Sequence, residues 1–433
     1  MGVKQILKKI VPKVLLEYYK TFLSFLVRSF NVIKYKSLIN DTYCHYECVK
    51  EKIKSRSDKK LRFGAYVIFD STFAAYDLFS LLLANDNAYS AKIVVIPDIS
   101  RGIQHMKQQY QSTKDFFINK YGETNVLDGW NEDTDEFIDN SSLFDVIYLS
   151  NPYDHMVNSV HGISYLSKQN VLPIYLSYGC MPDNYGCKVI MPMKEISLFW
   201  KVFADNEMSY KDYCKFELAK GKNVVLSGYA KMDSLVKFSK KKYDKKRIII
   251  APHHTINNSS LPLSNFIEYQ DFYLELPKLF PQIEFIFRPH PLLFINMVNN
   301  QFWTQEYVNT YISKIQESGM IYSVGGDYFD VFVNSDSIIH DCSSFVVEYL
   351  YTGKPCCFMA KRNYKKIFSL LGKECLKNYY LAYNKEQIID FIQNVVIENK
   401  DILVNSRQKF GENKLAINYP NVSELILKEI SIF

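Results

Sequence analysis

Short apolar runs rich in β-branched and aromatic residues recur along most of the chain, and longer segments with apolar residues at helical spacing separate them. Continuous apolar runs of about four to eight residues are typical of strands buried on both faces of a parallel sheet. The runs predict strands over residues 63–69, 92–97, 144–150, 171–177, 223–226, 247–251, 283–287, 337–340 and 356–359. The helical spacing predicts helices over residues 70–83, 103–121, 194–203, 209–220, 265–280, 302–318, 327–333, 385–398 and 422–430.

This alternation of strands and helices predicts two parallel sheets, because parallel strands are joined by right-handed helical crossovers. The charged stretch 237–246 separates the two sets and has the composition of an interdomain linker. We therefore expect an α/β protein with two Rossmann-like domains that face each other across a cleft. The expected parts are a basic amphipathic helical arm (1–60), a first domain (61–236), a second domain (247–415) and a C-terminal helix (416–433).

The N-terminal arm is apolar over residues 14–33 but carries Glu17, Lys20 and Arg28 within this run. A membrane-spanning helix needs about 20 mostly uncharged residues, so these charges argue against a transmembrane segment. They predict an amphipathic helix that lies on an anionic membrane surface through residues 1–36, at the cytoplasmic face of the plasma membrane. The alternative is a helix packed on the body of the protein. The cationic flank that favours the membrane consists of Lys4, Lys8, Lys9 and Lys13.

Charge is distributed unevenly along the 433 residues. Residues 1–62 contain 15 of the 52 Lys and Arg residues and only 5 of the 46 Asp and Glu residues, so the rest of the chain is slightly acidic. Such a body gives no reason to expect nucleic-acid binding. The nine cysteines form no CxxC pair, and Cys44 and Cys48 around His45 lack a second ligand pair. We therefore expect reduced thiols and no zinc site.

Polar clusters follow the predicted strands at their carboxyl ends. In open parallel sheets these ends share one edge, and ligands bind in the crevice outside it. We therefore expect a ligand cleft between the carboxyl edges of the two sheets. Its candidate segments are residues 70–71, 151–155, 178–182, 253–254, 288–290 and 341–344.

The segment Asp341-Cys342-Ser343-Ser344 lies between a predicted strand and a predicted short helix. Its residue types suit the N-cap and first turn of a helix, where two hydroxyls and free backbone N–H groups favour a phosphate. An ordinary turn with a capping serine explains the same residues. We expect Asp341 to cap the helix rather than to ionise in catalysis.

Several motifs of the second half occur in a defined order, namely LSGYAKMD (226–233), IIAP (249–252), RPHP (288–291), SD (335–336), DCSS (341–344) and KP (354–355). In this order they resemble the CDP-glycerol glycerophosphotransferases, the teichoic-acid primase and polymerase group. The resemblance implies a GT-B-type fold. The first half of the chain is similar to that family only in its architecture.

The resemblance implies that a polyol phosphate, such as glycerol phosphate, moves from a CDP-linked donor to a hydroxyl group, with release of CMP. The acceptor is then a lipid-linked or glycan chain in teichoic-acid-like or capsule synthesis. By the same resemblance Arg288, His290, Ser343 and Ser344 hold the donor diphosphate. Glu348 is placed to accept from ribose hydroxyls, and a solvated helix Glu explains it equally well. The sequence has no convincing DxD motif, and we expect neither a metal nor another cofactor.

The general base remains open. The acceptor loop of the family reads His-Gly-Thr-Pro, and here Tyr178-Gly179 stands in its place. A tyrosine of ordinary pKa, about 10, is a poor base at neutral pH. Two further departures are Cys342 in place of a tyrosine and an expected arginine that is missing beside His253-His254. The candidate bases are Asp154, His155, His253 and His254, and each histidine has a purely structural alternative.

Two other functions fit the same pattern. A GT-B glycosyltransferase that uses a nucleotide sugar for capsule or lipopolysaccharide synthesis keeps the fold and changes the donor. A non-catalytic adaptor in a surface-polymer assembly binds a nucleotide without turning it over. The released product, CMP or a nucleoside diphosphate, distinguishes the two enzymes, and the absence of any product indicates the adaptor.

Overall fold

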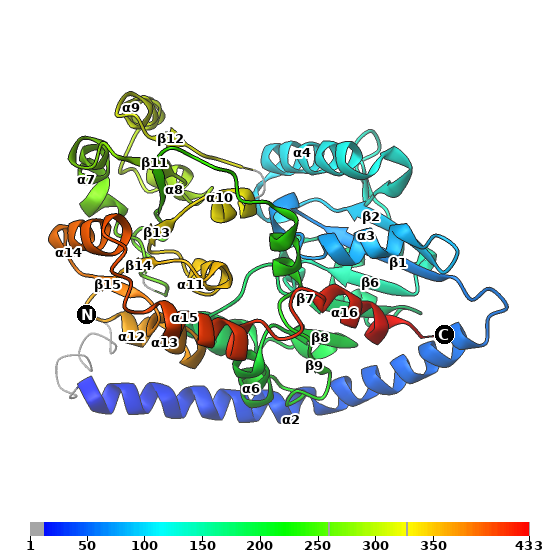
Figure 1. Cartoon of the computed structure of the whole chain (residues 1–433). Coiled ribbons are helices and arrows are strands. Elements are labelled where there is room, and N and C mark those ends of the chain that lie inside the picture. Colours follow the sequence, from blue (N-terminus) through cyan, green and yellow to red (C-terminus); the bar gives the residue numbers. More distant parts are fainter. Residues whose placement is uncertain (1–12, 259, 326–327, 433) are drawn as a thin grey trace.

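The computed structural model describes residues 13–258, 260–325 and 328–432 and shows two parallel sheets side by side (Figure 1). The first sheet has the order β3-β2-β1-β6-β7-β8-β9, and the second has the order β12-β11-β10-β13-β14-β15. The strands of the first sheet are β1 (Leu61–Val67), β2 (Tyr89–Val95), β3 (Val126–Asp128), β6 (Val146–Leu149), β7 (Leu172–Leu176), β8 (Lys201–Ala204) and β9 (Val224–Leu226). Those of the second are β10 (Lys246–Ala251), β11 (Ile283–Phe287), β12 (Ile321–Tyr322), β13 (Ser337–His340), β14 (Cys356–Met359) and β15 (Tyr380–Ala382).

Helices connect the strands and cover the sheets. Around the first sheet they are α3 (Tyr76–Ala84), α4 (Ile103–Tyr121), α5 (Ile163–Leu166) and α6 (Glu207–Phe216). Around the second they are α7 (Phe266–Leu279), α8 (Leu293–Asn299), α9 (Gln305–Glu317), α10 (Phe329–Val333), α11 (Phe345–Glu348), α12 (Tyr364–Ile367), α13 (Leu370–Leu376), α14 (Lys385–Asp390) and α15 (Val404–Phe410). A short antiparallel pair, β4 (Trp130–Asn131) and β5 (Glu136–Phe137), follows β3.

The predicted α/β class with two Rossmann-like parallel-sheet domains is confirmed. The helix predicted over residues 194–203 is wrong in its second half, because Lys201–Ala204 forms β8 between β7 and β9. Short apolar runs suit a buried strand as well as a helix, and pairing in the sheet decides between them. The helix predicted from residue 70 begins only at Tyr76, after a single 3-10 turn over Asp70–Thr72.

The N-terminal arm is one long helix, α2 (Lys13–Lys54), which runs along the outside of both domains (Figure 1). Its second half packs on the first domain, where Tyr43 Oη donates to Ser197 O at 3.0 Å and Tyr46 Oη donates to Leu198 O. Its first half leaves apolar side chains in solvent, and Phe30 is 65% exposed. In the described part of the chain, no helix combines the length and the apolar character that a membrane span needs.

The C-terminal helix α16 (Val422–Ile430) returns to the first domain and packs on α3 (Figure 1). Val422, Ile426 and Ile430 are fully buried in the core of that domain. Asp233 holds the start of α16, because its carboxylate accepts from Ser423 N–H at 2.7 Å. The aspartate of the LSGYAKMD motif therefore has a structural contact that joins the end of the chain to the first domain.

Candidate active site at the facing sheet edges

The carboxyl ends of the two sheets meet through the loops that follow β7 and β13. Ser343, after β13, donates from Oγ to Asp183 Oδ2 of the first domain at 2.6 Å. Gly179 lies so near Ser344 that a Cβ on the glycine would stand 3.9 Å from the serine Cβ. The carboxyl edges of the two sheets therefore face each other, and these two predicted site segments are in contact.

Asp341 does not cap α11, so the capping expectation from the sequence is wrong. Its buried carboxylate accepts from His253 N–H and from Asn265 N–H, each at 2.6 Å. Burial raises the pKa of Asp341 to about 6, and the hydrogen bonds oppose this rise. The carboxylate ties the loop after β10 and the start of α7 to β13. Ser344 occupies the N-cap position of α11 without a side-chain capping bond.

Glu348 is fully buried, so it is not the solvated helix residue that the sequence allowed. One carboxylate oxygen accepts from Tyr229 Oη of the first domain at 2.7 Å, and the other accepts from Tyr328 Oη. Lys231 Nζ lies 3.8 Å from the first oxygen, and Tyr229 Oη also accepts from Cys180 N–H at 3.0 Å. This carboxylate therefore links the two domains beside the acceptor loop.

Arg288 leaves β11 at the carboxyl edge, and its guanidinium is held in place by two hydrogen bonds. Nη1 donates to Ser323 Oγ and Nη2 donates to Gly325 O, both at 2.7 Å. The guanidinium carbon lies 5.8 Å from the ring centroid of Tyr328, which itself binds Glu348. A planar guanidinium in a fixed orientation is suited to binding two phosphate oxygens at once.

Three imidazoles pack together at the ends of β10 and β11. The ring centroids of His254 and His290 are 4.0 Å apart, and His253 lies 4.4 Å from His254 and 5.3 Å from His290. Burial lowers the pKa of His254 to about 4 and that of His290 to about 3, and it lowers the pKa of His253 well below its ordinary value. The three rings are therefore neutral near pH 7.

Hydrogen bonds at Nδ1 decide where two of these rings carry their protons. Leu292 N–H donates to His290 Nδ1 at 3.1 Å, and the Asn296 side-chain amide donates to His254 Nδ1 at 3.1 Å. A neutral imidazole that accepts at Nδ1 carries its proton on Nε2. In this state Nε2 donates to an anion, and it neither takes a proton from a hydroxyl nor ligates a metal, although the ligand atoms of the three rings lie within 4.8 Å.

The first-domain candidates differ in how far their polar atoms are engaged. Asp154 accepts from Ile163 N–H at 2.7 Å and from Ser164 N–H at 3.1 Å, so its carboxylate caps α5. His155 is exposed next to it. Burial raises the pKa of the Tyr178 hydroxyl, which makes this side chain still less suited to act as a base.

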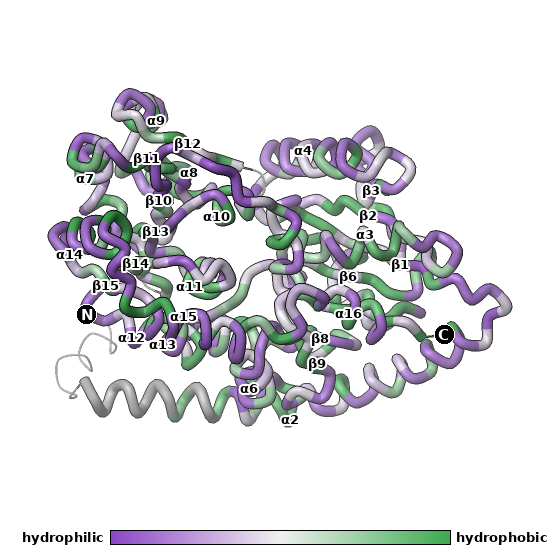
Figure 2. Tube along the Cα trace, in the orientation of Figure 1, coloured by the Kyte–Doolittle hydropathy of each residue, from purple (hydrophilic) through white to green (hydrophobic). Residues whose placement is uncertain are grey.

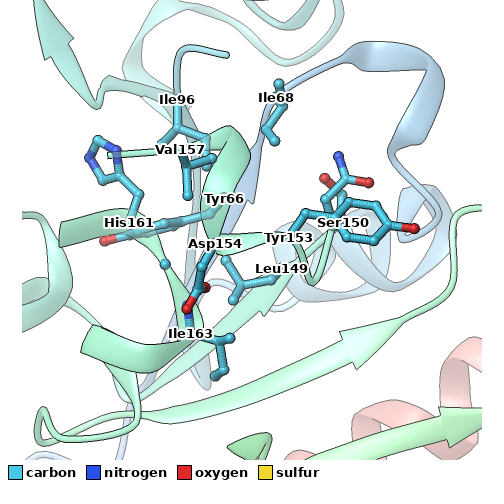
Figure 3. A pocket seen from close by; sticks show the side chains of 12 residues that line it. Tyr66, Ile68, Ile96, Leu149, Ser150, Tyr153, Asp154, Val157, His161 and Ile163 are labelled. Atoms are coloured by element: carbon cyan, nitrogen blue, oxygen red, sulfur yellow. The ribbon is translucent and has the colours of Figure 1, made fainter. Parts of the chain in front are cut away.

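A small hollow lies behind the loop that contains Asp154 (Figure 3). Tyr66, Tyr153 and His161 line it together with apolar side chains from β1, β2 and β6. Its volume is about 10 Å³, which is room for no more than about one water molecule. The hollow is therefore too small for a nucleotide-linked donor.

The predicted residues of the second domain form one connected group. Asp341 binds the backbone of His253, which packs against the ring of His290 at the end of the neighbouring strand. Arg288 reaches the interdomain carboxylate of Glu348 through Tyr328. Within the described residues, no recorded contact joins Asp154 or His155 to this group.

Sequence reasoning missed a polar cluster at the carboxyl end of β2. Asp98, directly after the predicted strand 92–97, is fully buried, and its Oδ2 faces Arg101 and His105. The available signal was an aspartate just after a strand, followed seven residues later by a histidine in the first turn of the next helix. This pattern is common in turns, and only the packing of α4 on β2 brings the side chains together.

No family model matches the chain, and no curated protein sequence matches it. Solved structures do. The wall teichoic acid polymerase TagF is similar with a TM-score of 0.57 and 13% identity, over 94% of this chain and 97% of that chain. A putative UDP-N-acetylglucosamine 2-epimerase from Listeria monocytogenes is similar with a TM-score of 0.51 and 12% identity, over 85% of this chain and 95% of that chain. UDP-GlcNAc 2-epimerase from Neisseria meningitidis, bound to UDP-GlcNAc, is similar with a TM-score of 0.50 and 13% identity, over 86% of this chain and 99% of that chain.

At these identities the likeness shows the fold and not the activity. It extends over nearly the whole of each compared chain, so it includes both sheets and the way they are paired. The GT-B-type arrangement implied by the sequence resemblance is therefore confirmed.

Proposed function

We propose that the protein transfers a polyol phosphate from a CDP-linked donor to a hydroxyl of a lipid-linked or glycan acceptor, and that it releases CMP. The observation that carries this proposal is the second-domain edge, where the oriented guanidinium of Arg288 and the neutral histidine cluster lie on adjacent strands. The motifs shared with the CDP-glycerol glycerophosphotransferases support it. So does the similar fold of the wall teichoic acid polymerase TagF.

Each donor-side group has a role that its hydrogen bonds allow. Arg288 binds two phosphate oxygens, and the Nε2–H groups of His290 and His254 donate to the same diphosphate. Ser344 adds a hydroxyl from the loop after β13 of the same domain, whereas the Ser343 hydroxyl already donates to Asp183. Transfer of a phosphoryl group depends on positioning and charge stabilisation rather than on a covalent intermediate, so fixed donors of this kind are what the reaction needs.

The first domain then holds the acceptor, and α2 brings it to a membrane. The exposed apolar residues of α2 include Phe22, Leu26, Phe30 and Ile33, which lie at helical spacing. Along the coloured part of α2 in Figure 2, hydrophobic residues are interspersed with hydrophilic ones. Such a face next to basic residues suits the interface of an anionic leaflet. The lysines expected to strengthen this contact, Lys4, Lys8 and Lys9, lie outside the described residues. The proposed location is the cytoplasmic face of the plasma membrane.

The test is a donor screen on the purified protein. CDP-glycerol, CDP-ribitol, UDP-glucose and UDP-GlcNAc are each incubated with a lipid-linked polyol-phosphate acceptor, and the released nucleotide is identified by chromatography. We expect CMP from a CDP-polyol, and we expect Arg288→Lys to lower its release by about 10²- to 10³-fold. Release of UDP from a UDP-sugar, with none of CMP, would contradict the proposal.

The nucleotide-sugar alternative has one observation in its favour. Two of the similar structures are UDP-GlcNAc 2-epimerases, and one of them holds UDP-GlcNAc. The UDP-sugar arms of the screen therefore test this alternative directly. Binding of a nucleotide without release of any product would favour the adaptor.

A further inference from the structure

A buried carboxylate and a half-exposed imidazole face each other at the carboxyl end of β2. Asp98 is fully buried, and its Oδ1 accepts from Ser100 N–H at 2.9 Å and from the Ser100 hydroxyl. Its Oδ2 forms no hydrogen bond in the described part of the chain. The nearest cationic atoms to Oδ2 are Arg101 Nε at 3.4 Å and His105 Nε2 at 3.8 Å.

The two nitrogens of His105 have different surroundings. Nε2 is buried against Asp98 and has no closer partner among the described residues, whereas 40% of the side chain is exposed. The ring nitrogen that can meet a substrate is therefore Nδ1. A carboxylate opposite Nε2 favours the tautomer with a proton on Nε2, and this leaves the lone pair of Nδ1 free. The Nδ1 atoms of His254 and His290, by contrast, already accept hydrogen bonds.

The dyad of Asp98 and His105 lies on the side of the first domain that faces the donor groups. β2, β1, β6 and β7 are parallel neighbours, so the carboxyl end of β2 lies at the same sheet edge as the loop after β7, which contacts Ser343 of the second domain. Ile99 and Ile103, which are 41% and 55% exposed, flank the dyad and offer apolar surface to an acceptor. The charged residues brought by the elements packed against the start of α4 are Asp70, Arg101, Asp154 and His155.

We propose that His105 is the general base that activates the acceptor hydroxyl, and that Asp98 is the positioning residue that orients it. The inference rests on the proposed function and adds the acceptor half of the reaction. It also explains how Tyr178 can stand where the resembled family has a histidine. The other first-domain candidate with polar atoms near this loop, Asp154, has both carboxylate oxygens engaged by backbone N–H groups.

The step balances without a metal or a redox partner. The acceptor O–H bond breaks and its proton passes to Nδ1 of His105. The acceptor oxygen forms a bond to the phosphorus of the transferred polyol phosphate, and the bond from that phosphorus to the bridging oxygen of the diphosphate breaks. CMP leaves with the electron pair, and the imidazolium, stabilised by the Asp98 carboxylate, releases its proton to solvent.

The first test replaces the base. His105→Gln is expected to lower acceptor-dependent CMP release by about 10²- to 10⁴-fold, because this is the range that a positioned general base supplies. Binding of the CDP-polyol, measured by isothermal titration, is expected to stay within about twofold, since His105 does not touch the donor in this proposal. His105→Gly with added imidazole is expected to recover part of the rate. His45→Asn on the outer helix α2 is the matched control and is expected to keep the wild-type rate.

The second test addresses the positioning residue. Asp98→Asn keeps an oxygen for Ser100 but removes the charge opposite Nε2, so it is expected to lower kcat and to shift the acidic limb of the pH–rate profile while KM for the donor is unchanged. A wild-type rate in His105→Gln, with the fold confirmed by circular dichroism, would overturn the inference and leave the proposed function standing. No CMP release by the wild-type protein from any CDP-polyol would overturn both.

Discussion

The carboxyl edges of the two sheets carry similar residue types but hold them in opposite ways. On the second sheet, Asp341, Glu348 and Arg288 already bond to neighbouring protein groups, and the histidine rings pack against one another. On the first sheet, Asp98 Oδ2 and His105 Nε2 have no hydrogen-bond partner among the described residues, and the imidazole is half exposed. The two carboxylates of the second edge are therefore already bonded to protein groups, whereas Asp98 Oδ2 on the first edge is not bonded within the described residues.

This difference suits the two halves of a transfer reaction. A diphosphate is a compact, highly charged group, and fixed donors bind it without the cost of reorganisation. An acceptor hydroxyl needs a base whose lone pair is free, and the Nδ1 atoms of His254 and His290 on the second edge already accept hydrogen bonds. The experiments below weaken one edge at a time and are ordered from the largest expected effect to the smallest.

Replacing the planar guanidinium of Arg288 is expected to have the largest effect on CMP release. Arg288→Lys keeps the charge but not the planar pair of donors, so we expect CMP release to fall by about 10²- to 10³-fold. Initial rates with saturating acceptor measure it. Arg247→Lys, at the amino end of β10 and away from the edge, is the control. Equal rates in the two variants would remove Arg288 from the donor site.

Removing the interdomain carboxylate of Glu348 is expected to lower the stability of the protein. Glu348→Ala leaves the hydroxyls of Tyr229 and Tyr328 without their buried acceptor, and each buried donor left unsatisfied costs about 1–3 kcal/mol of unfolding free energy. Urea denaturation followed by circular dichroism measures the change. The exposed Glu386→Ala should change the unfolding free energy by less than about 0.5 kcal/mol. A loss no larger than that in Glu348→Ala would show that the network is not holding the domains.

The exposed apolar residues of α2 test the acceptor side alone. In the proposed function, this helix brings the lipid-linked acceptor, but not the donor, to the site. Phe30 and Ile33 are 65% and 75% exposed, and full burial of such side chains is worth about 1.5–3 kcal/mol each. We expect the double variant Phe30→Ser, Ile33→Ser to bind anionic vesicles at least about tenfold more weakly in sedimentation, with donor turnover in solution unchanged. Asn40→Ser is the control. Unchanged sedimentation would mean that α2 is not the anchor.

Acid titration is expected to give the smallest effect and to act on the second edge. Burial lowers the pKa of His254 to about 4 and that of His290 to about 3, so the folded protein binds fewer protons than the unfolded chain between those values and about 6.5. Stability contributed by the neutral rings is therefore present above pH 6.5 and is lost as the pH falls towards 4.

Each such ring contributes up to about 1.4 kcal/mol of unfolding free energy per pH unit in this window. In His254→Asn, the unfolding free energy is expected to fall less steeply as the pH falls, because about one proton fewer is taken up on unfolding. Urea denaturation at several pH values measures this slope. His45→Asn should leave the slope unchanged. A slope in His254→Asn that equals the wild-type slope would show that this ring titrates normally in the folded state.

Much of the fold was predictable because buried parallel strands have a local signature. The apolar residues 248–251 and 338–339 lie between polar residues, and both runs belong to strands in the structure. Segments whose local pattern is ambiguous were not predictable. Lys201–Ala204 reads as part of a helix and becomes a strand only because two neighbouring strands pair with it.

The candidate site was predictable only in part, for the same physical reason. The sequence alone determined which segments stand at strand ends, and so it selected Arg288, His290 and Ser343 as residues of one edge. It did not determine the partners of their polar atoms, because those partners are distant in the chain. Asp341 binds the backbone of Asn265, and Ser343 binds Asp183 of the other domain.

Local patterning thus predicted nine of the thirteen strands that the described residues place in the two sheets, and with them the loops at the carboxyl ends of those strands. Only tertiary packing decided the protonation of each histidine, because this depends on burial and on which nitrogen accepts a bond. It also decided that Asp98 and His105 form a pair, since the first turn of a helix must pack against the end of a strand before the two side chains can meet.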